Sequence, residues 1–190
     1  FDATPCGERR VLLAELTGRH ANLLLLGPNE RLLEVLATPA AGSGKPVVLF
    51  VHGGGFAQGS KHAEGAPFYD NIGVWAVSQG LVGVTMNYRL APQSVWPSGI
   101  EDLAAAVAWL KANVAGYGGD PAKIVLWGHS AGAAHAADYV ADAAKRGRDL
   151  GLAGAVLTSG FYDLGAEVSV WKVYYGEDLA TYPERSSLPG

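Results

Sequence analysis

Two short glycine-rich stretches hold residues whose types and spacing suit acyl-transfer chemistry. Residues 128–132 read GHSAG, a G-x-S-x-G pattern centred on Ser130, and residues 52–56 read HGGGF. A serine hydroxyl can accept an acyl group when nearby N–H groups stabilise the oxyanion that forms. The two stretches together predict a serine nucleophile with an oxyanion hole.

The setting of Ser130 strengthens this prediction. Ten serines and 26 glycines in 190 residues would give about 0.2 G-x-S-x-G matches by chance. Here the motif lies between a strand-like stretch, residues 123–127, and a helical pattern over residues 131–145, which is the strand–turn–helix context of a nucleophile elbow. The alternative is a glycine-flanked serine that serves only as a turn or a helix N-cap, which this context makes the weaker reading.

The HGGGF stretch directly follows PVVLFV, residues 46–51, which has the composition of a buried strand. Consecutive glycines let backbone N–H groups turn inward without a side chain blocking the substrate, and α/β folds place ligands at the carboxyl ends of their strands. A flexible surface loop is the alternative reading. We interpret His52 as a structural hydrogen-bonding residue and not as a base.

Strand-like and helical patterns alternate through the rest of the chain. Further strands are expected at 81–86 and 152–159, and helices around 68–75 and 100–114. This order predicts one α/β domain over residues 1–190, with a mostly parallel sheet covered by helices on both faces. Residues 1–45 form an N-terminal segment, in which 21–26 and 31–38 flank GPNE and predict an antiparallel hairpin.

The composition excludes several other classes of protein. A hydrophobic fraction of 49% and a charged fraction of 17% are typical of a globular domain, and a net charge of -4 argues against nucleic acid as a partner. No apolar run approaches the ~20 residues of a membrane span. The single cysteine, Cys6, fits a reducing compartment, so we expect a cytoplasmic protein. No pattern calls for a metal or a cofactor.

HGGGF followed by GHSAG resembles the hormone-sensitive-lipase-like group of bacterial carboxylesterases, which have the α/β-hydrolase fold. The segments YRLAP at 88–92 and SGFYDL at 159–164 are similar to segments of that group, as are Trp96-Pro97 before Glu101-Asp102 and Gly119-Asp120-Pro121. The resemblance covers roughly residues 31 to 188.

The resemblance implies a hydrolase of small or short-chain esters that works through an acyl-enzyme on Ser130. It further implies that Gly54, Gly55 and Ala131 donate backbone N–H groups to the oxyanion. Arg89 with Glu101 or Asp102 would form a structural ion pair. Phe56 is a candidate substrate contact, and Trp75, Trp96 and Phe68 are candidates for an apolar pocket.

A base for Ser130 is harder to find. In this fold the chain order is serine, then an acid, then histidine. His135 is the only histidine after Ser130, and we expect it to face the body of the protein. Asp163 follows the next strand and is a candidate acid, whereas the resemblance makes it part of the structural SGFYDL segment. We therefore expect the domain to lack its last strands, with the missing Asp and His supplied by a C-terminal segment or a second chain. Residues 152–159 would then form an exposed apolar edge.

Two alternatives remain open. An arylformamidase or other amide hydrolase of the same fold would use the same serine with a different pocket. A non-catalytic ligand-binding protein would have lost the base altogether.

Overall fold

The computed structural model describes residues 23–27, 30–37, 43–62, 68–165 and 169–188. Residues 1–22, including the start of the predicted hairpin, lie outside the described ranges. The elements in chain order are β1 (Leu23–Gly27), β2 (Glu30–Leu36), β3 (Lys45–Val51), α2 (Asp70–Ser78), β4 (Val82–Met86), α3 (Ser98–Asn113), the 3-10 turn η1 (Val114–Tyr117), β5 (Gly119–His129), α4 (Ala131–Lys145), β6 (Gly154–Thr158), α5 (Ser169–Tyr175), η2 (Leu179–Thr181) and α6 (Tyr182–Arg185).

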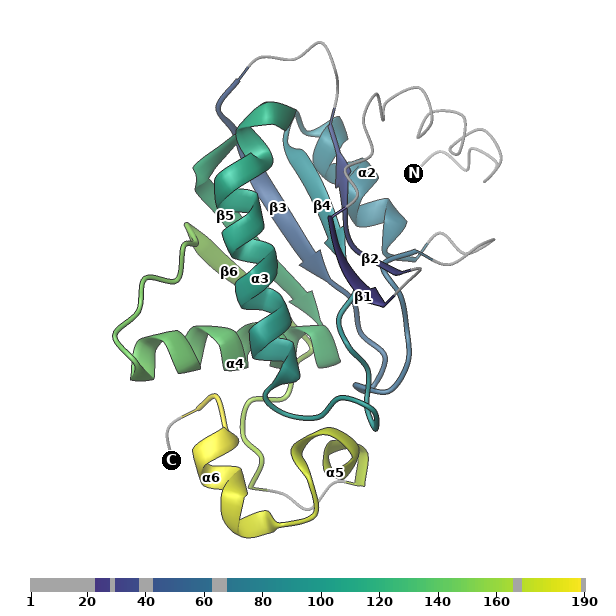
Figure 1. Ribbon diagram of the computed structural model, residues 1–190, viewed down its shortest axis with the longest axis vertical. Helices are drawn as coiled ribbons and strands as arrows, with labels where there is room; N and C mark the ends of the chain where they lie inside the picture. The colour runs from purple at the N-terminus through teal and green to yellow at the C-terminus, as the bar shows by residue number, and fades with distance from the viewer. Residues whose placement is uncertain (1–22, 28–29, 38–42, 63–67, 166–168, 189–190) are drawn as a thin grey trace.

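The strands form one sheet of six in the order β1-β2-β4-β3-β5-β6 (Figure 1). β3 pairs in parallel with β4 and β5, and β5 pairs in parallel with β6. β1 and β2 are antiparallel, and β2 joins the sheet antiparallel to β4. The prediction of a mostly parallel sheet is confirmed.

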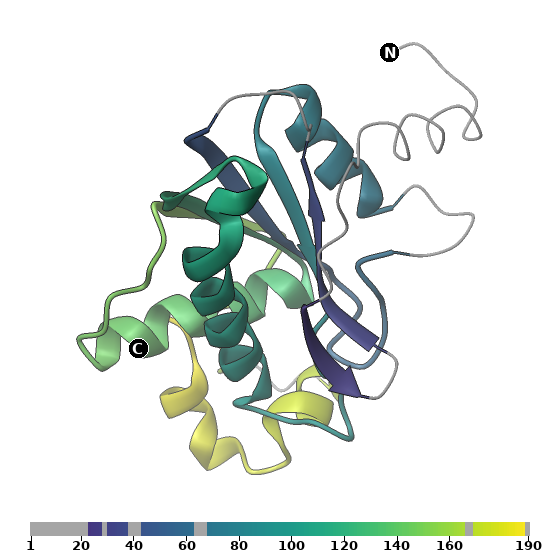
Figure 2. The same ribbon diagram turned by 45° about the horizontal axis from the view of Figure 1, so that its top comes forward.

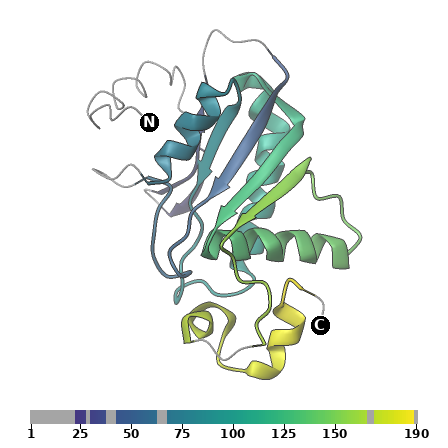
Figure 3. The same ribbon diagram turned by 180° about the vertical axis from the view of Figure 1, so that it is seen from behind.

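The central strands are apolar because both faces of the sheet are covered. β4 is buried along its whole length, and β3 is buried from Val47 to Val51. α2 lies against one face and α3 against the other, as the opposite views of Figures 1 and 3 show. α3 crosses α4, which begins directly after Ser130 (Figure 2). The crossovers therefore bring the carboxyl ends of β3 and β5 to the same edge.

A second, smaller core lies beyond that edge. α5 and α6 sit past the carboxyl ends of the parallel strands (Figure 1). Their buried aromatic side chains pack against residues of the glycine-rich loop and of the start of α4. The members of this second core are Phe56, Ala91, Ala131, Ala134, Leu164, Trp171, Tyr174, Tyr175 and Tyr182. The sequence patterns did not predict these two short helices.

β6 is the edge strand of the described sheet. All five of its residues are exposed, including Val156 at 46% and Leu157 at 40%. The expectation of an exposed apolar edge at residues 152–159 is confirmed, and within the described residues nothing pairs with the outer side of β6.

Candidate active site

Ser130 occupies the turn between β5 and α4 in an unusual backbone conformation. Its φ of 53° and ψ of -121° place a residue with a side chain in a region that glycine normally occupies. Its N–H donates to the carbonyl oxygen of Thr158 at 2.9 Å, which ties the turn to the end of β6. The hydroxyl is thereby presented at the carboxyl edge of the sheet.

The glycines two residues before and after Ser130 are required by close backbone approaches. A Cβ on Gly128 would lie 2.3 Å from the carbonyl oxygen of Gly132. A Cβ on Gly132 would lie 2.3 Å from the oxygen of Val51 and 2.5 Å from that of His52. Glycine at both positions lets α4 start against the end of β3, which brings the serine next to the HGGG loop.

The HGGG loop turns back on itself immediately after β3. Gly54 has φ 135° and Gly55 has φ 58°, and a Cβ on Gly54 would lie 1.9 Å from the carbonyl oxygen of Gln58. The Gly54 carbonyl accepts the N–H groups of Ala57 and Gln58 at 3.3 and 3.1 Å. No acceptor within the described part of the chain takes the N–H of Gly54, Gly55 or Ala131.

Gly53 brings this loop against the serine. The position of a Cβ on Gly53 lies 3.1 Å from the Cβ of Ser130. The structure thus collects Ser130, the loop glycines and the N-terminus of α4 at one point. This is an arrangement in which backbone donors could face an oxyanion formed at the serine.

His52 is a buried packing residue. Its Nδ1 lies 2.7 Å from the carbonyl oxygen of Gly53, and its ring stacks on Tyr88 with 4.4 Å between the centroids. The Tyr88 hydroxyl donates to the His52 carbonyl at 3.1 Å. Burial lowers the pKa of His52 to about 4, so the ring is neutral at neutral pH. This environment agrees with the structural role expected for it.

His135, on α4, is enclosed by aromatic rings. Its ring meets those of Phe56, Tyr88 and Tyr174 edge to face, with centroids 5.2, 4.4 and 4.8 Å apart. Neither ring nitrogen has a hydrogen-bond partner in the described residues, and burial lowers the pKa of His135 to about 3. It faces the packed interior, as the helical spacing predicts.

The other two described histidines are also in contact with groups other than the serine hydroxyl. His62 Nδ1 lies 2.6 Å from a carboxylate oxygen of Asp70, and His129 Nδ1 lies 3.3 Å from the hydroxyl of Tyr69. None of the four described histidines hydrogen-bonds to Ser130. Asp163 is exposed and accepts the N–H of Gly165 at 2.8 Å, which is a local turn contact. The described residues therefore assemble a serine and backbone donors without a base.

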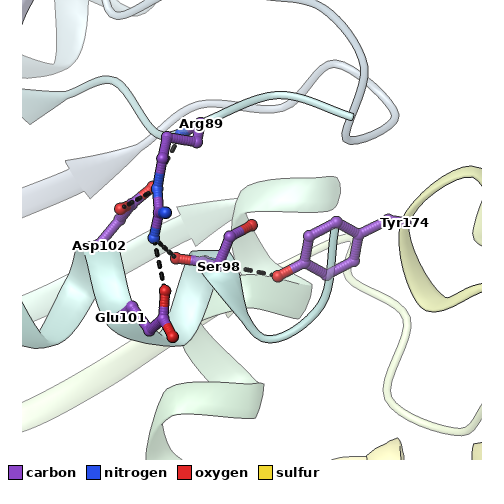
Figure 4. Close-up of polar contacts among 6 residues, drawn as sticks. Arg89, Ser98, Glu101, Asp102 and Tyr174 are labelled. Carbon is purple, nitrogen blue, oxygen red and sulfur yellow. Dashed lines mark hydrogen bonds and ion pairs between the residues drawn. The ribbon is translucent and has the colours of Figure 1, made fainter. Parts of the chain in front are cut away.

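The predicted ion pair at Arg89 is confirmed. Arg89 donates from its backbone N–H and its Nε to the two carboxylate oxygens of Asp102, each at 2.8 Å. Its Nη2 donates to Glu101 at 2.7 Å and to the Ser98 carbonyl at 3.3 Å (Figure 4). Asp102 is buried whereas Glu101 is exposed, so Asp102 is the structural partner. The pair holds the loop after β4 against the first turn of α3.

The candidate pocket aromatics lie in different environments. Phe56, proposed above as a substrate contact, is 1% exposed and stacks on Tyr174 with 4.9 Å between the ring centroids. It packs in the second core, and its role as a substrate contact stays a prediction. Phe68 is 70% exposed, and Trp75 packs edge to face on Trp127. Trp96 lies beneath the Arg185 guanidinium, 4.9 Å from its ring centroid.

Some contacts of the site were missed at the level of sequence. Tyr69 lies in the segment before α2 and reaches both Gly53 and His129. Asp138, on α4, accepts hydrogen bonds from Tyr175 and Ser187, each at 2.6 Å. These partners are 16 to 60 residues apart in the chain, so no local pattern could have paired them.

The described ranges contain neither a cluster of metal-ligating residues nor a helix that could span a membrane. Groups of three or more His, Cys, Asp or Glu that could hold a metal ion do not occur there. Every helix in those ranges falls short of the length and hydrophobicity that a transmembrane span requires.

The parallel sheet, its crossovers and the strand–serine–helix turn define the α/β-hydrolase fold. A carboxylesterase named EstE1, cloned from a metagenomic library, has a similar structure, with a TM-score of 0.71 at 24% identity, over 95% of this chain and 68% of that one. The BD-FAE family model matches residues 33–149, and the chain belongs to this family.

Relatives in Mycobacterium tuberculosis (strain H37Rv) bear esterase names. The esterase LipQ is 34% identical over 152 residues, which are 79% of this chain and 33% of LipQ. The carboxylesterase NlhH is 39% identical over 95 residues, which are 50% of this chain and 28% of NlhH. The chain thus spans about a third of the length of these relatives. The resemblance to α/β-hydrolase esterases that the motifs indicated is confirmed.

Proposed function

We propose that the protein carrying this chain is a serine carboxylester hydrolase that acts on small or short-chain esters. The observation that carries the proposal is the strained conformation of Ser130 at the β5–α4 turn, beside the HGGG loop at the end of β3. A strained residue of this kind persists only where the surrounding structure holds it, and such residues cluster at functional sites. The esterase names of LipQ and NlhH support the same reading.

In the proposed reaction the Ser130 hydroxyl oxygen attacks the ester carbonyl as a base takes its proton. The N–H groups of Gly54, Gly55 and Ala131 donate to the tetrahedral oxyanion. The alcohol then leaves with a proton from the same base, and the acyl group stays on Ser130. A water molecule then attacks the acyl carbonyl while the base takes its proton. The free acid leaves, and the base returns the proton to the Ser130 oxygen.

We infer that the base and its acid come from residues outside the described ranges. Support comes from the four described histidines, since each is buried among aromatic rings or bonded to another group. A further segment of the protein or a second chain would supply them.

A cytoplasmic location stays part of the proposal on the strength of the single cysteine, and cell fractionation tests it.

The test is active-site labelling of the full-length protein with a fluorophosphonate, together with hydrolysis of p-nitrophenyl butyrate. We expect stoichiometric labelling at Ser130. The Ser130→Ala variant should show no labelling and a loss of kcat of about 10⁴-fold or more, because the nucleophile is absent. A full-length wild type that is folded but neither labelled nor active would contradict the proposal and favour the ligand-binding alternative.

The same full-length protein can be used to distinguish an ester substrate from an amide or formamide substrate. Matched aryl ester and aryl formamide substrates are compared by kcat/KM. We expect the ester to be preferred, which the ester-hydrolase names of the relatives support. A preference for the formamide would favour an amide hydrolase over an esterase, with Ser130 still as the nucleophile.

A further inference from the structure

Tyr69 holds a costly backbone conformation directly before α2. Its φ of 72° with ψ of -37° lies in the left-handed half of conformational space, where a residue with a Cβ is strained. Its side chain does not cap the helix that follows. Such strain costs about 1–3 kcal/mol and must be offset by contacts that the residue makes elsewhere.

Those contacts converge on the candidate active site. The N–H of Gly53 donates to the Tyr69 hydroxyl oxygen at 3.2 Å, and that oxygen lies 3.3 Å from Nδ1 of His129. Because the tyrosine oxygen accepts the Gly53 proton, its own proton is free to be donated to His129. One hydroxyl therefore links the HGGG loop with the residue that immediately precedes Ser130.

The space around Gly53 shows how close this link lies to the serine. A Cβ placed on Gly53 would be 3.0 Å from the Tyr69 hydroxyl, 3.1 Å from His129 Nδ1 and 3.1 Å from the Ser130 Cβ. All three groups thus surround the same face of the loop. The Tyr69 ring also packs on Phe50 of β3, with 5.5 Å between the ring centroids.

We propose that Tyr69 is a positioning residue that keeps the HGGG loop in register with the serine elbow. This proposal rests on the proposed esterase function. By fixing the N–H of Gly53, the hydroxyl fixes the direction of the next two peptide groups, whose N–H groups would bind the oxyanion. A displacement of about 1 Å in such a site can cost ~10²-fold in rate.

The test is the Tyr69→Phe variant of the full-length protein, which keeps the ring and its packing on Phe50. We expect kcat for p-nitrophenyl butyrate and the rate constant for fluorophosphonate labelling each to fall about 10- to 100-fold, with KM changed less than about threefold. Tyr139→Phe is the matched control, since it also removes one hydroxyl–backbone hydrogen bond, at 2.8 Å to the Leu150 carbonyl. The control should lose similar thermal stability and keep its kcat.

A double-mutant cycle with His129→Ala tests the other end of the link. If the Tyr69 hydroxyl connects the HGGG loop with the serine elbow, the fold-loss of kcat in the double variant is smaller than the product of the fold-losses in the two single variants. If the two single fold-losses of kcat multiply in the double variant, Tyr69 and His129 act independently, which would count against the proposal. An increase in KM with unchanged kcat in Tyr69→Phe would make Tyr69 a substrate contact instead, and a kcat equal to that of Tyr139→Phe would also overturn the proposal.

The outcome separates this inference from the proposed function. An active, labelled wild type with an unaffected Tyr69→Phe variant overturns only the positioning role. A folded wild type that is neither active nor labelled removes the esterase function and the positioning role together.

Discussion

Ser130 illustrates how one backbone conformation constrains the residues on both sides of it. The serine turns sharply between β5 and α4, and this turn leaves room for no side chain at Gly128 or Gly132. Gly132 meets two carbonyl oxygens at the end of β3, so it sets the distance between the helix and the HGGG loop. The G-x-S-x-G pattern is thus a packing requirement as much as a chemical one.

Replacing Gly132 with alanine should therefore destabilise the fold and slow the chemistry. Its Cβ would lie 2.3 Å from the oxygen of Val51, a backbone atom that cannot rotate away. We expect a loss of about 3 kcal/mol in the free energy of unfolding, measured in urea, and slower fluorophosphonate labelling of Ser130.

Gly116→Ala is the control for this substitution. Gly116 is not among the glycines with a positive φ and has nothing within 4 Å of a Cβ, so the free energy of unfolding should change by less than about 0.5 kcal/mol. Equal stability of the two alanine variants would show that α4 can move away from β3 without cost.

The loop between β4 and α3 is fixed by charge at one end and by an aromatic residue at the other. Asp102 accepts two hydrogen bonds from Arg89, and the Tyr174 hydroxyl accepts the N–H of Gly99 at 2.9 Å (Figure 4). The first turn of α3 is therefore tied both to the loop and to α5. These ties connect the main sheet with the second core beside the serine.

The two carboxylates next to Arg89 should differ in their contributions to stability. Asp102→Ala removes a buried acceptor and leaves the Arg89 N–H without its partner, so we expect the free energy of unfolding to fall by about 2–3 kcal/mol. Glu101→Ala removes a carboxylate that is 61% exposed, and the loss should stay below about 1 kcal/mol. Urea unfolding of both variants measures the difference. A larger loss for Glu101→Ala would reverse the assignment of the structural partner.

At the scale of the whole molecule, local sequence patterns predicted the sheet far better than the second core. Apolar runs and helical spacing were sufficient for β3, β4, α3 and α4, because each of these elements has a long, regular buried face. α5 and α6 are short, and their aromatic residues find partners on distant elements, such as Tyr174 with Gly99. For the same reason the packing of Phe56 in the second core could not be predicted from the sequence. Ser130 was identifiable because its constraints are local, whereas Tyr69 acts across 60 residues.

The second core is also where a buried carboxyl group joins distant parts of the chain. Asp138 on α4 accepts hydrogen bonds from the hydroxyls of Tyr175 and Ser187. Lys145 on the same helix donates to the carbonyls of Glu184 and Ser186 at 3.0 and 3.3 Å. Burial raises the pKa of Asp138 from 3.8 to about 7, although both hydroxyls and the charge of Lys145 oppose the rise.

This environment predicts a pH dependence of stability opposite to that of most paired carboxylates. Between about pH 4 and pH 7 the folded protein keeps the Asp138 proton while the unfolded chain releases it. The folded state then binds more protons, so this group's contribution to stability is present below pH 4 and is lost as the pH rises through 7. The difference between a pKa of 3.8 and one of about 7 corresponds to about 4 kcal/mol.

Asp138→Asn, which resembles the protonated acid, should remove that pH dependence. We expect urea unfolding to give the variant a growing advantage over the wild type from pH 4 to pH 7, on the order of 4 kcal/mol in total. Asp178→Asn is the control at an exposed carboxylate, because Asp178 lies before η2 and asparagine caps a helix about as well as aspartate. Because the position is exposed, its free energy of unfolding should stay within about 0.5 kcal/mol of the wild type at each pH. If Asp138→Asn also ran parallel to the wild type, Asp138 would be ionised in the folded protein, and the second core would be held by a charged carboxylate.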